Sequence, residues 1–366
     1  MKTDIQIINC HTHIFNRSIV PDRFLPFILR PIANLLQSVN TSNGIARFLS
    51  VLGKKDTALL IKKYNQFLKI GDLKSQLEIF KLLQSFYPDN TKFCVLPMDM
   101  EFMKAGNVKQ NYKDQLDELA KIKRDPAYRD LILPFIFIHP ERMGLFSLVR
   151  KYIEEENFAG LKMYPPLGYY PFDERLDQVF AYAEKNNIPV TSHCARGGVF
   201  YKGSVTDEMR KHPITGKVFQ QHKNKFFTDI YTDPDNYEYL FVKYPNLKLN
   251  LAHFGGFDEW QKFLQSSIDS SGELNWFEKV KTIIRKYKNA YTDISYTLFE
   301  KDLIPLLNIT LQDPTLNSKI LFGTDYYMVE QETSDKEFSI NLRSTIGEEN
   351  FRLIAEQNPK LFLNLK

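Results

Sequence analysis

Short apolar, β-branched or aromatic runs recur along the chain, and longer polar segments with helical periodicity separate them. These runs are expected to be strands, because each is short and rich in residues that favour extended backbone. The run over 131–138 is apolar on both faces, as a parallel strand covered by helices should be. The pattern predicts eight strands, over residues 5–10, 93–98, 131–138, 159–164, 188–193, 247–252, 290–295 and 320–323.

Segments between these runs carry the spacing of amphipathic helices. Residues 112–124 place Leu116, Leu119 and Ile122 on one face, and similar patterns cover 145–156 and 176–186. Strands that alternate with helices predict an α/β protein with a closed parallel (β/α)8 TIM barrel. A doubly wound open sheet is the alternative.

The chain has 366 residues, whereas a minimal barrel needs about 250. We expect a single domain over 1–366, with a helical insertion at about 15–90 after the first strand; helical patterns fall at 59–67 and 73–86. A long loop over 197–243 is expected after the fifth strand. Both additions follow carboxyl ends of strands, where this architecture builds its active sites, so they are expected to form pocket walls.

Composition narrows the classes of partner. The chain is 43% hydrophobic and 25% charged, and its net charge of +4 is not concentrated in any block. We therefore expect a small-molecule substrate and neither a nucleic-acid nor a membrane partner, while assembly into a homo-oligomer stays open. Three cysteines without a CxxC pair, and the lack of a long apolar leader, favour a cytoplasmic protein.

The first candidate for chemistry is the pair His11 and His13, which follows the first predicted strand. In extended backbone, residues two apart point the same way, so these imidazoles face one point. Two imidazoles at a strand end suit a metal ion, although a lone His-x-His motif is often incidental.

Other residues that can bind a metal share this kind of location. His139, His193 and His253 each end a predicted strand. Lys162 lies in the fourth strand, and Asp325 follows the eighth. The carboxyl ends of barrel strands converge on one mouth, so their side chains are expected to meet there. Two histidines fall in the long loop and are expected to face solvent: His212 and His222.

Each of these residues also has a structural interpretation. His193 and His253 are compatible with buried histidines satisfied by backbone carbonyls, Lys162 with an ion pair, and Asp325 with a helix cap. Their joint placement favours a shared site. Imidazoles with one carboxylate suit Zn2+ or a similar divalent ion, which lowers the pKa of bound water toward about 7. Asp325 is then placed to act as general base, with His253 or His193 assisting as charge develops.

The order His11-Thr12-His13, Lys162, His193, His253 and Asp325 resembles the pattern of the amidohydrolase superfamily, in particular amidohydrolase family 2. Supporting stretches lie at 160–166, 321–325 and 354–362. This branch includes aminocarboxymuconate-semialdehyde and resorcylate-type decarboxylases as well as hydrolases of esters, lactones and amides. The resemblance covers nearly the whole chain except the insertion.

The resemblance implies a set of metal ligands. His11, His13 and Asp325 would bind the more buried ion, and His193 would complete a mononuclear site. One ion, zinc or another divalent metal, is favoured over two.

A binuclear site is the alternative that the family allows. In such members the strand-four lysine is carboxylated and bridges two ions, and Lys162 and His253 permit that arrangement here. Both residues are therefore candidate metal ligands and candidate catalytic residues. Asn9 departs from the family, because many relatives have an aspartate there. That change affects the surroundings of the ligands and not ligation itself.

Four residues are candidates for substrate contact. Arg196 follows His193 by three residues and could bind a carboxylate bidentately, with a loop ion pair as the alternative. Tyr164 shares the inward parity of Lys162. The remaining two, His139 and Tyr326, are neighbours of strand ends.

These features predict a metal-dependent hydrolase of a C–O or C–N bond in a small carboxylate-bearing or cyclic molecule. A metal-dependent non-oxidative decarboxylase on the same site is the alternative. A metal-binding module without catalysis is a third hypothesis, against which Asp325 counts, because a purely structural site needs no additional base.

Overall fold

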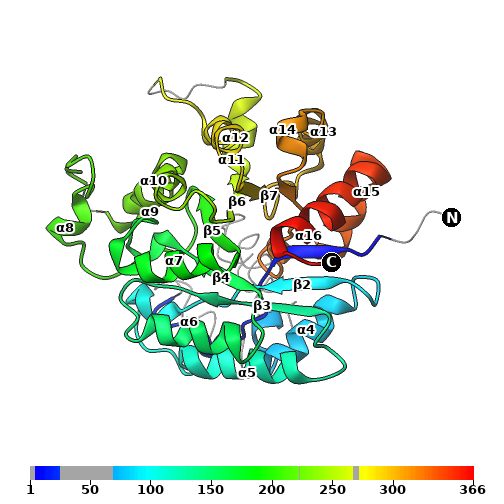
Figure 1. Ribbon diagram of the computed structural model, residues 1–366, viewed down its shortest axis with the longest axis horizontal. Coiled ribbons are helices and arrows are strands. Elements are labelled where there is room, and N and C mark those ends of the chain that lie inside the picture. Colours follow the sequence, from blue (N-terminus) through cyan, green and yellow to red (C-terminus); the bar gives the residue numbers. More distant parts are fainter. Residues whose placement is uncertain (1–4, 25–68, 222, 267–271) are drawn as a thin grey trace, which may run out of the picture.

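The computed structural model describes residues 5–24, 69–221, 223–266 and 272–366. Its strands run parallel to their neighbours and follow one another around the sheet in chain order. Helices lie outside them, so the molecule is the predicted (β/α)8 barrel, nearly closed (Figure 1). The strands are β1 (Ile8–Thr12), β2 (Lys92–Val95), β3 (Ile132–Phe137), β4 (Gly160–Met163), β5 (Val190–Ala195), β6 (Leu249–Gly255), β7 (Ala290–Asp293) and β8 (Ile320–Leu321).

The eight predicted strands are confirmed, with ends that differ by a few residues. The α-helices of the described residues are α4 (Gln76–Gln84), α5 (Tyr112–Arg124), α6 (Leu145–Glu154), α7 (Asp177–Lys185), α8 (Asp207–Arg210), α9 (Asn224–Thr232), α10 (Glu238–Lys243), α11 (Phe257–Phe263), α12 (Trp276–Lys286), α13 (Ile304–Thr310), α14 (Pro314–Asn317), α15 (Asp335–Arg352) and α16 (Asn358–Leu363). Short helical turns join them at η1 (Arg17–Ile19), η3 (Met100–Met103), η4 (Pro165–Leu167), η5 (Glu174–Leu176), η6 (Pro234–Tyr237), η7 (Lys301–Leu303), η8 (Val329–Gln331) and η9 (Leu353–Gln357).

Helix α5 shows how the local sequence sets an element. It begins after Asn111, whose side chain accepts a hydrogen bond from the backbone N–H of Asp114. Leu116 and Leu119 are buried, and basic residues occupy the last turn, where they complement the helix dipole. The helix covers the predicted residues 112–124.

The two additions to the barrel differ from one another. In the first, the predicted helical pattern at 73–86 is confirmed as α4, whereas the pattern at 59–67 lies outside the described residues. The second is not simply a long loop, because it contains α8, α9 and α10. Helix α9 forms because Phe227 and Tyr231, four residues apart, are buried on one face.

The expectation that His212 faces solvent was wrong, and His222 lies outside the described residues. His212 is buried with its ring centroid 4.9 Å from that of Tyr170, and its Nε2 lies 3.2 Å from Oδ1 of Asn236. Aromatic side chains of the segment after β4 therefore help to enclose this imidazole.

The C-terminal helix closes the barrel at the end where the strands begin. Phe362 and Leu363 of α16 pack with apolar side chains such as Ile8 and Leu321. Lys248, just before β6, donates a hydrogen bond of 2.5 Å to the carbonyl of Leu361. The polar residues predicted to bind a metal lie at the opposite end, where the strands finish.

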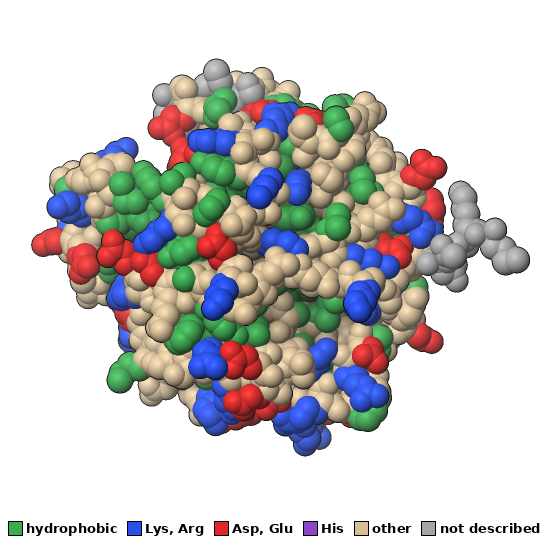
Figure 2. All heavy atoms as spheres, in the orientation of Figure 1, with side chains coloured by type: hydrophobic (Ala, Val, Ile, Leu, Met, Phe, Trp, Pro, Cys, Tyr) green, Lys and Arg blue, Asp and Glu red, His purple; other side chains and the backbone are tan. Residues whose placement is uncertain are grey.

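The face in Figure 2 shows basic and acidic side chains interspersed. Among the described residues, no helix has both the length and the apolar character that a membrane span requires.

Candidate metal centre

Six of the predicted residues come together at the carboxyl ends of the strands. His11 lies in β1, and His13 follows that strand directly. The others are contributed by β4, β5, β6 and the segment after β8, and all six line one cavity of about 850 Å³: His11, His13, Lys162, His193, His253 and Asp325.

The rings and the carboxylate are in direct contact. Nε2 of His13 lies 3.1 Å from Oδ1 of Asp325, and Nε2 of His11 lies 3.6 Å from the same oxygen. The ring centroids of His11 and His253 are 4.8 Å apart, and those of His253 and His193 are 4.7 Å apart. Nζ of Lys162 lies 3.5 Å from Nε2 of His11. Residues separated by hundreds of positions thus share one small volume.

The hydrogen bonds of three imidazoles direct their Nε2 atoms toward that volume. Nδ1 of His13 lies 2.7 Å from the carbonyl of Leu96, and Nδ1 of His253 lies 2.9 Å from the carbonyl of Ser295. Nδ1 of His11 lies 3.0 Å from a carboxylate oxygen of Asp293. Because each Nδ1 faces an acceptor, it carries the ring proton, and Nε2 presents a lone pair.

Buried atoms without hydrogen-bond partners show whether the site fits a cation. Oδ1 of Asp325 and Nε2 of His193 are buried, and neither has a hydrogen-bond partner in the described part of the chain. A carboxylate oxygen therefore stands opposite imidazole lone pairs. Such a set of atoms repels itself unless a cation or additional protons lie among them. Imidazole and carboxylate donors are the set that zinc and similar divalent ions accept, so the residues fit a metal ion.

Electrostatics keep the imidazoles in the form that binds a metal. Burial, reinforced by the charge of Lys162, lowers the pKa of His11 to about 3. Burial also lowers the pKa of His253, and holds that of His193 well below its ordinary value. The rings are therefore neutral at neutral pH, as ligation requires.

The charged groups respond differently. Burial alone would raise the pKa of Asp325, but the imidazoles of His13 and His11 outweigh it and hold that pKa below the usual range. Burial lowers the pKa of Lys162 to about 8, against the charges of Asp293 and Asp325. Asp325 is thus an ionised carboxylate within the centre.

The backbone at the site is strained at two of these residues. His253 has φ of 71° and Asp325 has φ of 60°, in the left-handed region that non-glycine residues seldom adopt. Gly323 leaves room for a ligand, because a Cβ at this position would lie 2.8 Å from Cβ of His11. Strained backbone at His253 and Asp325 and a glycine at 323 therefore occur where the ligands converge.

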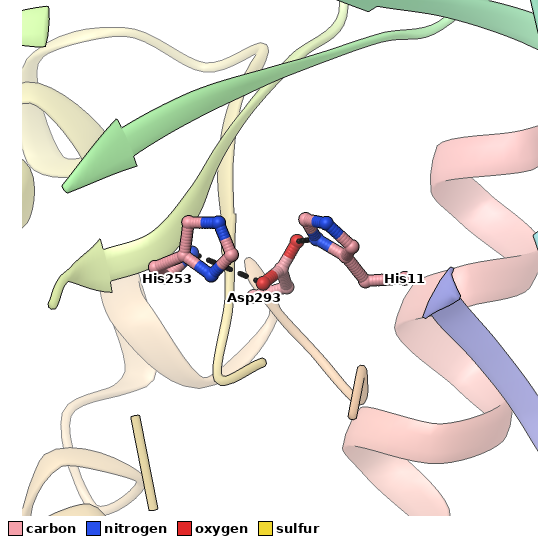
Figure 3. Close-up of side chains that lie close together, drawn as sticks. All are labelled: His11, His253 and Asp293. Atoms are coloured by element: carbon pink, nitrogen blue, oxygen red, sulfur yellow. Dashed lines mark hydrogen bonds and ion pairs between the residues drawn. The ribbon is translucent and has the colours of Figure 1, made fainter. Parts of the chain in front are cut away.

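Sequence reasoning missed Asp293, which ends β7 and is fully buried (Figure 3). One of its carboxylate oxygens pairs with Nδ1 of His11, and the other accepts the backbone N–H of His253 at 3.1 Å. Asn250 donates a further hydrogen bond of 2.7 Å. Asp293 therefore orients the imidazole of His11 and holds the backbone of His253. An acidic residue at the end of an apolar strand was the available signal.

The predicted substrate-contact residues are placed unequally. Arg196 and Tyr164 line the cavity, whereas His139 and Tyr326 are not among its lining residues. His139 is stacked on Phe102 with ring centroids 3.9 Å apart. Both side chains are buried outside that lining.

Arg196 is held by other side chains. Its Nε lies 3.0 Å from Oε1 of the buried Glu259, another nitrogen lies 3.4 Å from Asp229, and its guanidinium is 4.2 Å from the ring centre of Trp276. Its charge is therefore largely balanced before any ligand binds.

Tyr164 has a different environment. The backbone N–H of Val199 donates to its hydroxyl oxygen at 2.9 Å, and its ring centroid lies 4.6 Å from that of His193. A Cβ at Gly198 would come within 2.4 Å of the same oxygen, so a glycine is needed there. The hydroxyl is thus fixed from two sides at the wall of the cavity.

Comparison with known families identifies the chain. The model of the amidohydrolase family matches residues 146–365, more than half of the sequence. The chain belongs to the amidohydrolase family and is an enzyme of that group. No curated protein matches it.

Solved structures show a similar fold at low identity. A 5-carboxyvanillate decarboxylase from Novosphingobium aromaticivorans, complexed with manganese and 4-hydroxy-3-methoxy-5-nitrobenzoic acid, has a TM-score of 0.59 and 13% identity; the match covers 100% of this chain and 97% of that one. An uncharacterised TIM-barrel protein from Bordetella bronchiseptica gives 0.56 and 16%, covering 98% of each chain. A zinc-bound amidohydrolase from Burkholderia multivorans gives 0.50 and 10%, covering 80% of this chain and 89% of that one. At these identities the likeness concerns the fold.

Proposed function

We propose that this protein is a metal-dependent hydrolase of an ester, lactone or amide bond. One observation carries the proposal. An ionised carboxylate oxygen of Asp325, buried and without a hydrogen-bond partner among the described residues, lies within reach of imidazole lone pairs in the wall of the cavity. A general base in such a position can accept a proton from water.

His11, His13, His193 and Asp325 are the residues that would hold a divalent ion, with zinc as the first candidate. When bound, such an ion supplies Lewis acidity, which makes water more acidic and polarises a carbonyl. One ion accounts for these four donors. Lys162 and His253 line the same cavity and would be additional donors if a second ion bound.

The side chains of this protein then divide the proton transfers. Asp325 accepts the proton that water loses as its oxygen bonds to the acyl carbon. The same proton then passes to the leaving oxygen or nitrogen as the C–O or C–N bond breaks. His253, whose Nδ1 is held by Ser295, offers Nε2 as a second site for that proton. The fixed hydroxyl of Tyr164 can donate a hydrogen bond to a substrate oxygen.

The walls of the cavity indicate the kind of substrate. They include aromatic and thioether side chains, among them Phe15, Met98, Met103, Phe200, Phe299 and Met328. These groups favour a cyclic or aromatic body. Because Arg196 is already paired with Glu259, the proposal does not require a substrate carboxylate at Arg196, as the sequence had suggested.

A non-oxidative decarboxylase is the second candidate. The aromatic and thioether side chains of the cavity suit an aromatic ring, and the full-length fold likeness includes a decarboxylase solved with manganese and a nitrobenzoic acid ligand. In that reaction the C–C bond to the carboxylate breaks and a proton is delivered to carbon. Asp325 would have to act as the acid and not as the base.

Isotope and product analysis separates the two reactions. The zinc-loaded protein is incubated in ¹⁸O-water with a panel of aryl esters, aryl lactones and aromatic carboxylic acids. Hydrolysis predicts ¹⁸O in the product carboxylate and no CO2. Release of CO2 without incorporation of solvent oxygen would replace the hydrolase by the decarboxylase, and turnover of neither class would reject both.

A further inference from the structure

Four polar side chains lie behind the metal centre, where β8 meets β1. Asn9, Thr324 and Asp335 are fully buried, and Tyr87 is 8% exposed. Asn9 and Thr324 each stand beside a ligand-bearing segment, Asn9 two residues before His11 and Thr324 next to Asp325. Tyr87 precedes β2, and Asp335 is the first residue of α15.

Hydrogen bonds link these side chains around the junction of the two strands. The amide nitrogen of Asn9 donates to the hydroxyl of Thr324 at 2.9 Å and to that of Tyr87 at 3.4 Å. The Tyr87 hydroxyl donates a short hydrogen bond to Oδ1 of Asp335. The Thr324 hydroxyl also interacts with this carboxylate. We call these four residues the seam ring.

The donors and acceptors of these hydrogen bonds have one possible order. The Tyr87 hydroxyl proton goes to the Asp335 carboxylate, so the Tyr87 oxygen presents lone pairs to the amide protons of Asn9. This fixes which end of the Asn9 amide is the nitrogen. Its oxygen must therefore point the other way.

That oxygen joins the two ligand-bearing segments. Oδ1 of Asn9 accepts the backbone N–H of His11 and the backbone N–H of Thr324, each at 3.2 Å. A single side chain thus holds β1 against the end of β8. The orientation of that side chain depends, through the Tyr87 hydroxyl, on Asp335.

The position of Asp335 is not explained by the helix that it begins. Ser334 already caps α15, because its side chain accepts the backbone N–H of Glu337. A carboxylate at a helix start is usually solvated, whereas this one is buried, which disfavours its ionised form. Burial raises the pKa of Asp335 to about 7, against the hydrogen bonds from Thr324 and Tyr87 that lower it.

We propose that Asp335 is a positioning residue of the metal centre, which acts through Tyr87, Thr324 and Asn9 to fix the spacing between His11 and Asp325. The inference rests on the metal centre of the proposed function but not on which bond the enzyme breaks. Outer residues that orient ligands commonly change metal affinity by about 10–100-fold.

The test measures zinc binding rather than turnover. Metal-free full-length protein is titrated with Zn2+ in a calorimeter at a pH well above 7, and the absorption spectrum of the Co2+ form is recorded. Asp335→Asn and Tyr87→Phe should each raise the Kd for zinc by about 10–100-fold. Both should shift the Co2+ spectrum, because the ligand spacing changes.

Asp99→Asn is the matched control. Asp99 is also a buried carboxylate near a strand end, but it pairs with Arg142 and touches none of the six residues of the centre. It should leave the Kd and the Co2+ spectrum unchanged even if it lowers the melting temperature. Tyr87→Phe, which removes one oxygen, serves if Asp335→Asn does not fold.

Three results would overturn the proposal. The first is a wild-type Kd and spectrum in both seam-ring variants. The second is an equal effect of Asp99→Asn. The third is failure of the unchanged protein to bind zinc, which would remove the metal centre as well. Zinc binding without hydrolysis would instead count against the proposed reaction and leave this inference standing.

Discussion

Two pairs of neighbouring strands supply most of the metal centre, and they are held together differently. β5 and β6 carry His193 and His253, and their ladder runs from Val190 opposite Leu249 to Ala195 opposite Gly255. β8 and β1 carry the other ligands but share no such ladder among the described residues. Their contacts include Cys10 N to Phe322 O and Asp325 N to His11 O, both 2.8 Å.

The difference shows what fixes each ligand. At β5 and β6, paired backbone runs from Val190 opposite Leu249 up to the ligand His193 opposite Ala252, and the register shifts only beyond it, so the ladder sets much of the ligand position. At the junction of β8 and β1, the side chains of Asn9 and Thr324 and the missing side chain of Gly323 take over much of that task. Ligands at this junction should therefore be more sensitive to changes in residues that bind no metal.

The largest expected effect is that of Asp325→Asn. It removes the base and a charged donor while keeping the shape of the side chain. We expect kcat/KM on the best ester or lactone of the panel to fall by about 10²–10⁴-fold, the usual contribution of a general base. Steady-state kinetics check this, with circular dichroism to confirm folding. Activity within a factor of two of wild type would remove Asp325 from the mechanism.

The next largest effect is expected for Asp293→Asn. The change removes the negative charge that holds Nδ1–H of His11, while the amide oxygen can still accept the N–H of His253. Zinc affinity should fall by about 10–100-fold. Calorimetric titration measures it. An unchanged Kd would mean that the tautomer and orientation of His11 do not depend on this carboxylate.

A smaller effect is expected for Gly323→Ala, which places a methyl group 2.8 Å from Cβ of His11. The crowding should lower the free energy of unfolding by about 1–3 kcal/mol and weaken zinc binding. Gly71→Ala is the matched control, since a Cβ there meets nothing closer than 3.8 Å. Chemical denaturation of both variants provides the comparison. Equal stabilities would show that the junction has more room than its distances indicate.

The smallest effect concerns the unchanged protein without its ion. Chelation should increase amide hydrogen exchange at Asp325 and His13 more than at Val190 or Thr191, because the junction relies more on the ligands themselves. Exchange measured with and without Zn2+ tests this. A uniform change across both strand pairs would contradict the contrast between them.

Much of the fold could be predicted from the sequence because its cause is local. The strands are short apolar runs, and α5 has both its spacing and its cap within fourteen residues, 111–124. The meeting of His11, His193 and Asp325 could also be inferred, because the barrel brings all strand ends to one face.

The rest depended on contacts that no local pattern contains. Asp293 looks like an ordinary strand residue until its partners His11 and His253 are placed. Asp335 reads as a helix-start acid, yet its carboxylate is buried against Tyr87, 248 positions away. The pairing of Arg196 with Glu259 likewise depends on where α11 packs.

The central claim is that these side chains bind one divalent ion, and metal analysis of purified protein tests it most directly. Protein equilibrated with Zn2+ and freed of excess metal is analysed by mass spectrometry of the elements, alongside a His11→Ala/His13→Ala double variant and His212→Ala as a histidine control. We predict one ion per chain in the unchanged protein and in His212→Ala, and almost none in the double variant. An unchanged protein without stoichiometric metal, or a double variant that keeps it, would contradict the claim.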